Sequence, residues 1–245
     1  MSGEDGYFGE HVAARYDESY CTMFEPEFVD PIVDLLVELA GGGRALELGI
    51  GTGRIAVPLA QRGVPVHGID LSQAMVARLR EKAGAEEIGV TIGDFATARA
   101  DGAFAVAYLV FNAIMNLRTQ PEQVACFQNV AAQLEPGGCF VLEVMIGELQ
   151  RLPPGETSRP FNLSADHVGL DEYDVADQGL RSHHFSLVDG SWEYSTFPGR
   201  YVWPSELDLM AELAGMRLRD RWADWNREPF TSESRKHVSV WEKPR

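Results

Sequence analysis

Three glycines at alternate positions, Gly49, Gly51 and Gly53, follow a short apolar run over residues 44–48. Glycine adopts positive φ and has no Cβ, so a turn of this composition brings peptide N–H groups close to a polar or anionic ligand. The pattern predicts a strand, a tight turn and a helix start that bind a nucleotide-like cofactor. The dinucleotide fingerprint G-x-G-x-x-G would need a third glycine at position 54, where the chain has Arg54, and this disfavours a nicotinamide cofactor.

A carboxylate ends the next apolar run, at Asp70. Open α/β nucleotide-binding folds place an acid about twenty residues after the glycine turn, where it accepts hydrogen bonds from ribose hydroxyls. A third apolar run over 88–92 leads to Asp94, and a fourth over 104–111 ends in Phe111-Asn112. The spacing predicts that these residues share one edge of a parallel sheet.

Four landmarks in this order resemble the class I S-adenosylmethionine-dependent methyltransferases. The family's first motif, E-x-G-x-G-x-G, stands here as Glu47-Leu-Gly-Ile-Gly-Thr-Gly53, and it is followed by Asp70, by Gly93-Asp94-Phe95 and by Leu134-Glu-Pro-Gly-Gly138. The resemblance implies S-adenosyl-L-methionine as cofactor and S-adenosyl-L-homocysteine as product. The cofactor contacts that it implies are Tyr16, Glu47, Gly49, Gly51, Gly53, Asp70, Leu71, Met75, Asp94, Phe95 and Val110.

Residues for the acceptor come from the N-terminal region and from the end of the fourth run. In the small-molecule methyltransferases that this chain resembles, a Tyr-Asp pair, here Tyr16-Asp17, closes over the methionine end of the cofactor. The family places acceptor contacts at the segment that matches Phe111-Asn112. Methyl transfer from a sulfonium is an in-line displacement that depends mainly on positioning if the nucleophile is an amine, whereas a hydroxyl nucleophile would need a base. We therefore assign four residues to the catalytic side, with packing in the core as the alternative: Tyr7, Tyr16, Phe111 and Asn112.

The composition excludes several classes of partner. A formal net charge of −16 disfavours nucleic acids, because phosphate backbones are held by clustered Lys and Arg. No apolar run reaches the length of a membrane span, and the acidic N-terminus does not match a signal peptide, so we expect a cytoplasmic protein. Three widely spaced cysteines and the adjacent pair His183-His184 lack metal-ligand spacing, so we expect no metal.

Strand and helix patterns alternate over residues 44–145, which predicts an α/β, doubly wound and mostly parallel sheet of the Rossmann-like methyltransferase type. After residues 152–160, which are rich in Pro and Gly, three stretches near 167–175, 180–188 and 192–202 alternate without helices, and Asp189-Gly190 is a strong hairpin signal. We expect an antiparallel insertion that acts as a substrate lid. A helix from Pro204 and strands near 216–222 and 237–242 would complete seven strands.

The whole chain is predicted to form a single methyltransferase domain over 1–245. Its parts are an N-terminal helical cap over 1–40, a cofactor-binding core over 41–146, the antiparallel insertion over 147–203, and a C-terminal helix with a strand hairpin over 204–245. The resemblance implies methyl transfer to a small-molecule amine, as in enzymes that tailor aminosugar or lincosamide-type antibiotics. Methylation of a hydroxylated metabolite, or cofactor binding without turnover, are the alternatives. The oligomeric state stays open, with a homo-oligomer among the outcomes.

Overall fold

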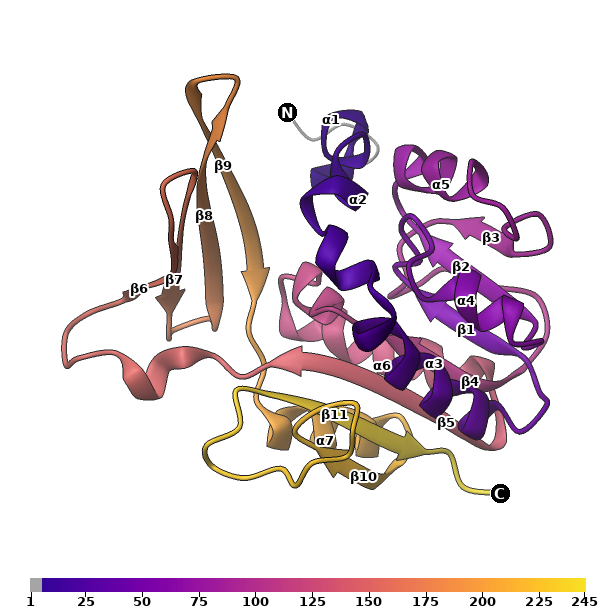
Figure 1. The fold of residues 1–245 in the computed structure, drawn as a ribbon. Coiled ribbons are helices and arrows are strands. Elements are labelled where there is room, and N and C mark those ends of the chain that lie inside the picture. The colour runs from indigo at the N-terminus through magenta and orange to yellow at the C-terminus, as the bar shows by residue number, and fades with distance from the viewer. Residues whose placement is uncertain (1–5) are drawn as a thin grey trace.

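The computed structural model describes residues 6–245, and its centre is a seven-stranded sheet in the order β10-β11-β5-β4-β1-β2-β3 (Figure 1). Strands β1 to β5 form parallel pairs, and β11 runs antiparallel to both β5 and β10. This confirms the predicted doubly wound, mostly parallel sheet. The strands are β1 (Ala45–Leu48), β2 (Val66–Asp70), β3 (Gly89–Ile92), β4 (Phe104–Leu109), β5 (Leu134–Met145), β10 (Arg217–Trp222) and β11 (Lys236–Glu242).

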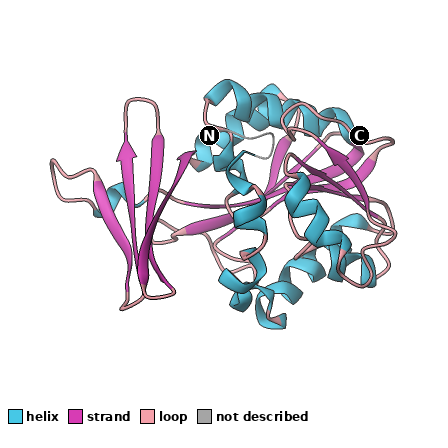
Figure 2. Cartoon of the chain, turned by 90° about the horizontal axis from the view of Figure 1, so that it is seen from above, coloured by secondary structure: helices cyan, strands magenta, loops and turns pink. Residues whose placement is uncertain are grey.

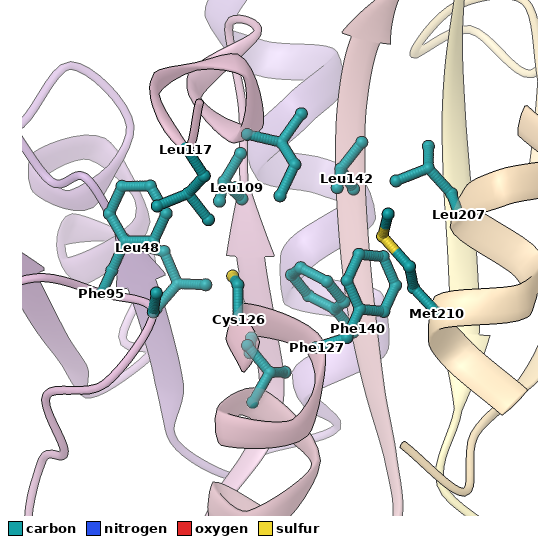
Figure 3. Packing of buried hydrophobic residues seen from close by; sticks show 14 of the residues in the cluster. Leu48, Phe95, Leu109, Leu117, Cys126, Phe127, Phe140, Leu142, Leu207 and Met210 are labelled. Carbon is teal, nitrogen blue, oxygen red and sulfur yellow. The ribbon is translucent and has the colours of Figure 1, made fainter. Parts of the chain in front are cut away.

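Helices cover both faces of this sheet, because successive residues of each strand point to opposite sides. Ala45 packs in the cluster that contains α3, α4 and α5, whereas Leu46 and Leu48 pack in the cluster that contains α6 and α7. Figure 3 shows the second cluster, in which the Phe127 ring lies 5.1 Å from Phe140 and 5.3 Å from Trp241, between ring centroids. The helices are α3 (Pro26–Ala40), α4 (Ala56–Gln61), α5 (Gln73–Arg80), α6 (Gln120–Gln133) and α7 (Pro204–Leu213).

Local capping explains where the helices around the site begin. The Ser72 hydroxyl accepts a hydrogen bond of 3.1 Å from the Met75 N–H and so caps the start of α5. Thr119 and Glu122 form a reciprocal capping box at the start of α6. Two short 3-10 helices, η3 (Ala113–Asn116) and η4 (Glu148–Arg151), follow the ends of β4 and β5. These turns lie at the carboxyl edge of the sheet, where the predicted site residues gather.

The N-terminal segment is a series of short helices and not one continuous helix. It consists of η1 (Gly6–Phe8), α1 (Glu10–Ala13), α2 (Tyr16–Ser19) and η2 (Cys21–Phe24). In one continuous helix Tyr7 and Tyr16 would be about two and a half turns apart and would face opposite sides. The breaks let both rings face the same part of the molecule. Residues 1–5 of the predicted cap lie outside the described residues.

A separate antiparallel sheet forms the insertion and stands beside the N-terminal segment (Figures 1 and 2). Asp189 and Gly190 have φ of 49° and 80° and join β8 to β9, which confirms the predicted hairpin. The prediction missed β6, because a Pro-containing stretch reads as a loop. Pro160 is tolerated because β6 is an edge strand. The strands are β6 (Ser158–Leu163), β7 (His167–Asp174), β8 (Gly179–Val188) and β9 (Ser191–Arg200).

In the part of the chain that the structure describes, no helix has both the length and the apolar composition needed to cross a membrane.

Candidate active site

The turn after β1 has the backbone conformation that its glycines predict. Gly49, Gly51 and Gly53 have φ of 67°, 53° and 80°, a region that residues with a Cβ rarely adopt. An ideal Cβ on Gly51 would lie 3.3 Å from Cε of Met75, and one on Gly53 would overlap the Leu79 side chain. The glycines therefore permit both the turn and the close packing of α5 against it.

Asp70 ends β2 directly beside this turn. Its Oδ2 accepts a hydrogen bond of 2.7 Å from the Gly51 N–H, and its Oδ1 accepts one of 2.8 Å from the Ser72 N–H. A carboxylate has about four acceptor positions, so one such group can accept hydrogen bonds from the backbone and from ligand hydroxyls together. Asp70 thus supports the glycine turn, and its predicted contact with the cofactor stays a prediction.

Glu47 lies on β1 beneath the turn and is 2% exposed. Its Oε2 accepts a hydrogen bond of 3.0 Å from the Tyr108 hydroxyl. Burial raises the pKa of Glu47 to about 8, although the Tyr108 hydrogen bond and the charge of Arg54 act in the opposite direction. Glu47 therefore supports the turn from inside the fold, and nothing tests its predicted contact with the cofactor.

The remaining residues predicted to contact the cofactor follow the ends of β2, β3 and β4. Leu71 is 48% exposed, next to Asp70, and can cover a flat apolar ring. Asp94 is exposed, and its Oδ1 accepts a hydrogen bond of 2.8 Å from the Ala96 N–H. Phe95 and Val110 are buried beside the same edge of the sheet. The structure therefore brings these four predicted residues to one edge, around the glycine turn.

We call the glycine turn together with Asp70 and α5 the cradle, and several polar contacts fasten the N-terminal segment to it, among them an ion pair of 2.6 Å between Glu10 and Arg78. Asp17 bonds both to the Thr52 hydroxyl and to the Lys82 ammonium, at 2.5 Å each. The Ser72 hydroxyl donates to the Phe8 carbonyl at 2.6 Å, and Arg54 donates to the Met23 carbonyl at 3.2 Å. Thr52 lies between the second and third glycines, so Asp17 connects the segment directly to the glycine turn.

A row of aromatic rings joins the insertion, the N-terminal segment and the end of β4. It brings together Tyr7, Tyr16 and Phe111, three of the four residues predicted on the catalytic side. Successive ring centroids are separated by 5.3 Å for Phe197 and Tyr7, 5.1 Å for Tyr7 and Phe8, 6.3 Å for Phe8 and Tyr16, 4.9 Å for Tyr16 and Tyr20, and 5.3 Å for Tyr20 and Phe111.

The tyrosine hydroxyls in this row stay protonated at neutral pH. Burial raises the pKa of Tyr16 well above its ordinary value, with a further contribution from Tyr20. Burial also raises the pKa of Tyr7, whose hydroxyl is hydrogen-bonded to the Ser195 side chain. Both residues can therefore orient a ligand by hydrogen bonding, but neither is suited to act as a base.

Phe111 and Asn112 both adopt left-handed backbone conformations, with φ of 55° and 63°. Such strain persists only where neighbouring groups hold it, and it is common at functional sites. The Phe111 N–H donates to Glu143 Oε2 at 3.2 Å, and Asn112 Oδ1 accepts a bond of 2.6 Å from the Met145 N–H. Lys236 bonds to the other oxygen of Glu143 at 2.9 Å. The Asn112 oxygen thus holds the end of β5, and a contact between Asn112 and the acceptor stays a prediction.

The sequence analysis did not identify Tyr20, Phe197 or Glu143. Tyr20 belongs to the same aromatic-rich stretch as Tyr16, so the composition held a signal for it. Glu143 is an acid within an otherwise apolar strand, which indicates a buried polar role. Phe197 reaches the row only through the fold of the insertion, and its position in the sequence gave no indication of this contact.

The two faces of the insertion sheet differ. We call the face that carries Phe197 and Ser195 the inner face, because both contact Tyr7. His184 lies on the inner face, since it pairs with Ser195 across β8 and β9. His183 lies on the outer face, where it contacts Glu172 at 3.3 Å and the Tyr194 hydroxyl at 2.8 Å. Within residues 6–245, no three His, Cys, Asp or Glu side chains form a group that could hold a metal ion.

These residues fit the predicted cofactor. The glycine-rich turn suits a polar, nucleoside-bearing ligand, the Asp70 carboxylate lies beside it, and exposed Leu71 offers an apolar surface. The aromatic row passes this turn, because Asp17 follows Tyr16 and bonds to Thr52. The cradle and the row therefore form one continuous site.

Comparison with known proteins agrees with this geometry. The family model "Methyltransferase domain" matches residues 45–138. The chain is 27% identical to the cypemycin N-terminal methyltransferase of Streptomyces sp, over 82% of this chain and 84% of that protein. It is 31% identical to the putative methyltransferase YqeM of Bacillus subtilis, over 79% and 81%. The solved structure of the CcbJ methyltransferase from Streptomyces caelestis is 33% identical, covers 99% of this chain and 100% of its own, and superposes with a TM-score of 0.86.

Proposed function

Because the chain belongs to the class I S-adenosylmethionine-dependent methyltransferases, we propose that it transfers the methyl group of this cofactor to an amine nitrogen of a small-molecule acceptor. The observation that carries the proposal is the aromatic row from Phe197 to Phe111, which begins in the insertion and ends beside the cofactor cradle. Such a row can surround the alkyl parts of an amine and exclude water.

The chain's residues have separable tasks in this proposal. Gly49, Gly51 and Asp70 hold the nucleoside end of the cofactor. Tyr16 lies at the methionine end, next to Asp17, which fastens the N-terminal segment to the glycine turn. When bound, S-adenosylmethionine supplies an electrophilic methyl group on sulfur. Tyr7 and Phe111 line the acceptor side and fix the direction from which the nucleophile approaches. Alignment of this kind can contribute about 7–11 kcal/mol to lowering the barrier.

Two observations support an amine over a hydroxyl acceptor. A net charge of −16 attracts cations, and free amines are cationic at neutral pH. The name of the cypemycin N-terminal methyltransferase indicates an amino terminus as the acceptor of that relative. Transfer to a hydroxyl of a small metabolite is the second candidate, and tailoring of an antibiotic stays a prediction from the resemblance.

A direct screen tests the proposal. The protein is incubated with S-adenosylmethionine and, separately, with D-glucosamine, L-alaninamide and benzylamine as amines and with catechol as a hydroxyl acceptor. Mass spectrometry should detect an N-methylated amine and no methylated catechol. Methylation of catechol alone would favour the O-methyltransferase, and cofactor binding without any product would favour a binding protein.

Gly51→Val is the matched inactive control for this screen. A branched side chain at φ of 53° is strained and would press on Met75. The variant should therefore lose cofactor binding in calorimetry and form no product. Product from this variant at the wild-type rate would show that the methylation does not depend on the glycine turn.

A further inference from the structure

Asp171 is a buried carboxylate on the inner face of the insertion sheet. It is 8% exposed and lies in one cross-strand row with Ser182 and Phe197, whose ring contacts Tyr7. The Ser182 hydroxyl is hydrogen-bonded to the Asp171 carboxylate, and the Tyr173 hydroxyl lies 3.5 Å from its Oδ2. Asp171 therefore faces the side of the insertion on which the aromatic row begins.

The described chain supplies no cation to this carboxylate. Arg159 stands opposite Asp171 on β6, but its guanidinium pairs with Glu148 and donates to the Arg151 carbonyl at 3.1 Å. Within residues 6–245, no Lys, Arg or His nitrogen lies within salt-bridge distance of Asp171. Buried carboxylates are normally paired with a cation, because desolvation of an unpaired charge is unfavourable. Such a group is suited to a cation that arrives with a ligand.

Other charged and titratable groups near Asp171 do not replace that cation. Glu148 is negative and is already paired with Arg159, and Tyr173 is neutral because burial raises its pKa to about 12. His183 lies on the opposite face and contacts Glu172. Burial raises the pKa of the Asp171 carboxyl above its ordinary value, although the Ser182 and Tyr173 hydrogen bonds act against this. Asp171 is consequently a stronger base than an exposed aspartate.

A hydrogen-bonded chain leads from Asp171 along the inner face. The Ser182 hydroxyl lies 3.2 Å from His184 Nε2, and His184 Nδ1 lies 3.1 Å from His167 Nε2. Burial lowers the pKa of His184, and the charge of His167 acts in the same direction. A neutral imidazole accepts a proton on one nitrogen and donates from the other. The chain can therefore carry a proton from Asp171 toward the far end of β7.

Asp171 also lies near the end of β5, where Phe111 and Asn112 are held. Tyr173 lies two residues further along β7, and a Cβ on Gly147 would be 3.6 Å from its ring. Gly147 follows β5 by two residues, and the last residue of β5, Met145, bonds to Asn112. Asp171 thus lies on the face that carries Phe197, the first ring of the aromatic row, and is linked through Tyr173 to the residues that follow β5.

We propose that Asp171 binds the ammonium group of the acceptor and takes its proton, and that Ser182, His184 and His167 carry this proton to solvent. The inference rests on the proposed amine acceptor. The N–H bond of the ammonium breaks and an O–H bond forms on Asp171, which leaves a lone pair on nitrogen. That pair forms the new N–C bond while the C–S bond breaks and its electrons return to sulfur. Asp171 then donates to Ser182 Oγ, Ser182 to His184 Nε2, His184 Nδ1 to His167 Nε2, and His167 Nδ1 to water.

The test is the pH dependence of kcat/KM for Asp171→Asn with the amine that the wild type methylates among D-glucosamine, L-alaninamide and benzylamine. At about pH 7, where the amine is protonated, the variant should be slower by about a hundredfold. At about pH 10 the amine is already neutral, so the two rates should converge. A loss that is equal at every pH would indicate a structural role and would overturn the proposal.

Two further variants sharpen the result. Glu172→Gln is the matched control, because Glu172 is the next residue of β7 and bonds to His183 on the outer face; it should keep the wild-type profile. Ser182→Ala keeps the carboxylate but interrupts the chain, so its loss should be smaller than that of Asp171→Asn and should also disappear at high pH. A wild-type profile for Ser182→Ala would remove the relay and leave Asp171 as the only base.

The outcomes separate this inference from the proposed function. If the wild type methylates none of the three amines, both fail. If it methylates an amine and Asp171→Asn follows the wild-type profile, the proposed function stands and the role of Asp171 is wrong. Calorimetry with S-adenosylmethionine and thermal unfolding should show that Asp171→Asn keeps its cofactor site and its fold.

Discussion

At the scale of single residues, Asp70 combines support of the backbone with expected binding of the cofactor. Both of its oxygens already accept backbone hydrogen bonds, from Gly51 and from Ser72. Removing the carboxylate therefore affects two properties at once, and the two can be measured separately.

We expect Asp70→Ala to weaken binding of S-adenosylmethionine and also to destabilise the fold. Each hydrogen bond to a charged group is worth about 1.5–3 kcal/mol. The variant loses the hydrogen bonds that the carboxylate would accept from ribose, and it also loses those that it accepts from the backbone. Calorimetry measures the first effect and thermal unfolding without cofactor the second. Asp30→Ala, at an exposed acid 3.5 Å from Arg62, is the control and should change neither. Unchanged affinity in Asp70→Ala would remove Asp70 from the site.

Tyr16→Phe should lower turnover more than stability. The ring keeps its contacts with Phe8 and Tyr20, whereas the hydroxyl that would orient a ligand is lost. Because the pKa of Tyr16 is raised, the hydroxyl is protonated on both sides of neutrality, so the loss in kcat should not depend on pH. A pH-dependent loss would show that Tyr16 exchanges a proton, contrary to this expectation.

Glu47 should make the cofactor-free protein less stable as pH rises. The folded pKa of Glu47 is about 8, above the ordinary 4.5, so the native state binds an extra proton between these values. The stabilisation is fully present below about pH 4.5 and is lost as pH rises through about 8. Glu47→Gln should therefore have a flatter stability profile in thermal unfolding and exceed the wild type at high pH. Parallel profiles would mean that Glu47 ionises normally.

The sequence was sufficient to predict the glycine turn and the position of Asp70 at the end of the next strand, because each depends on spacing along one βα unit. It was insufficient for Glu143 and Asp171. Glu143 acts on Phe111 from a neighbouring strand, and the inner-face position of Asp171 depends on the register between β7 and β8. Contacts of this kind arise from tertiary structure and leave no local pattern.

At the scale of elements, the N-terminal segment acts as a cover that is latched to the cradle. Its short helices contribute no buried residue to the two main core clusters, which begin with Val29 of α3 and with Leu46 of β1. The sequence did not indicate the breaks between these short helices, since aromatic residues at irregular spacing specify contacts rather than one helical face. The edge strand β6 was also missed. Proline lacks an N–H, so Pro160 conflicts with a strand only at a position where an N–H would bond to a neighbouring strand.

Deleting residues 1–20 should leave the sheet folded while reducing cofactor affinity and catalysis. The deletion removes Asp17, with its bonds to Thr52 and Lys82, and the rings of Tyr7 and Tyr16. Circular dichroism and cooperative unfolding check the fold, and calorimetry and turnover check the site. Asp17→Ala tests the latch alone and should reproduce part of the affinity loss. Full activity of the truncated chain would mean that the acceptor site is built without this segment.

At the scale of the whole molecule, the alternation of strands and helices predicted a doubly wound, mostly parallel sheet of seven strands, and the hairpin signal predicted the antiparallel insertion. The relative placement of the two sheets was beyond prediction, because it depends on contacts between distant segments. The outer face of the insertion carries exposed Phe185, Leu187, Trp192 and Tyr194. The homo-oligomer nevertheless stays a prediction, to be checked by light scattering.

The contact between Tyr7 and Phe197 joins the beginning of the chain to a strand near its end. During synthesis the glycine turn and its neighbouring strands can assemble from contiguous sequence, whereas this contact must wait until β9 has left the ribosome. Closing so long a loop costs conformational entropy, and the contact buries little backbone. It is therefore also among the first contacts to open in the native state. Amide hydrogen exchange should therefore be faster in residues 6–24 than in β1 and β4, and the segment that opens first is the one through which we expect ligands to enter.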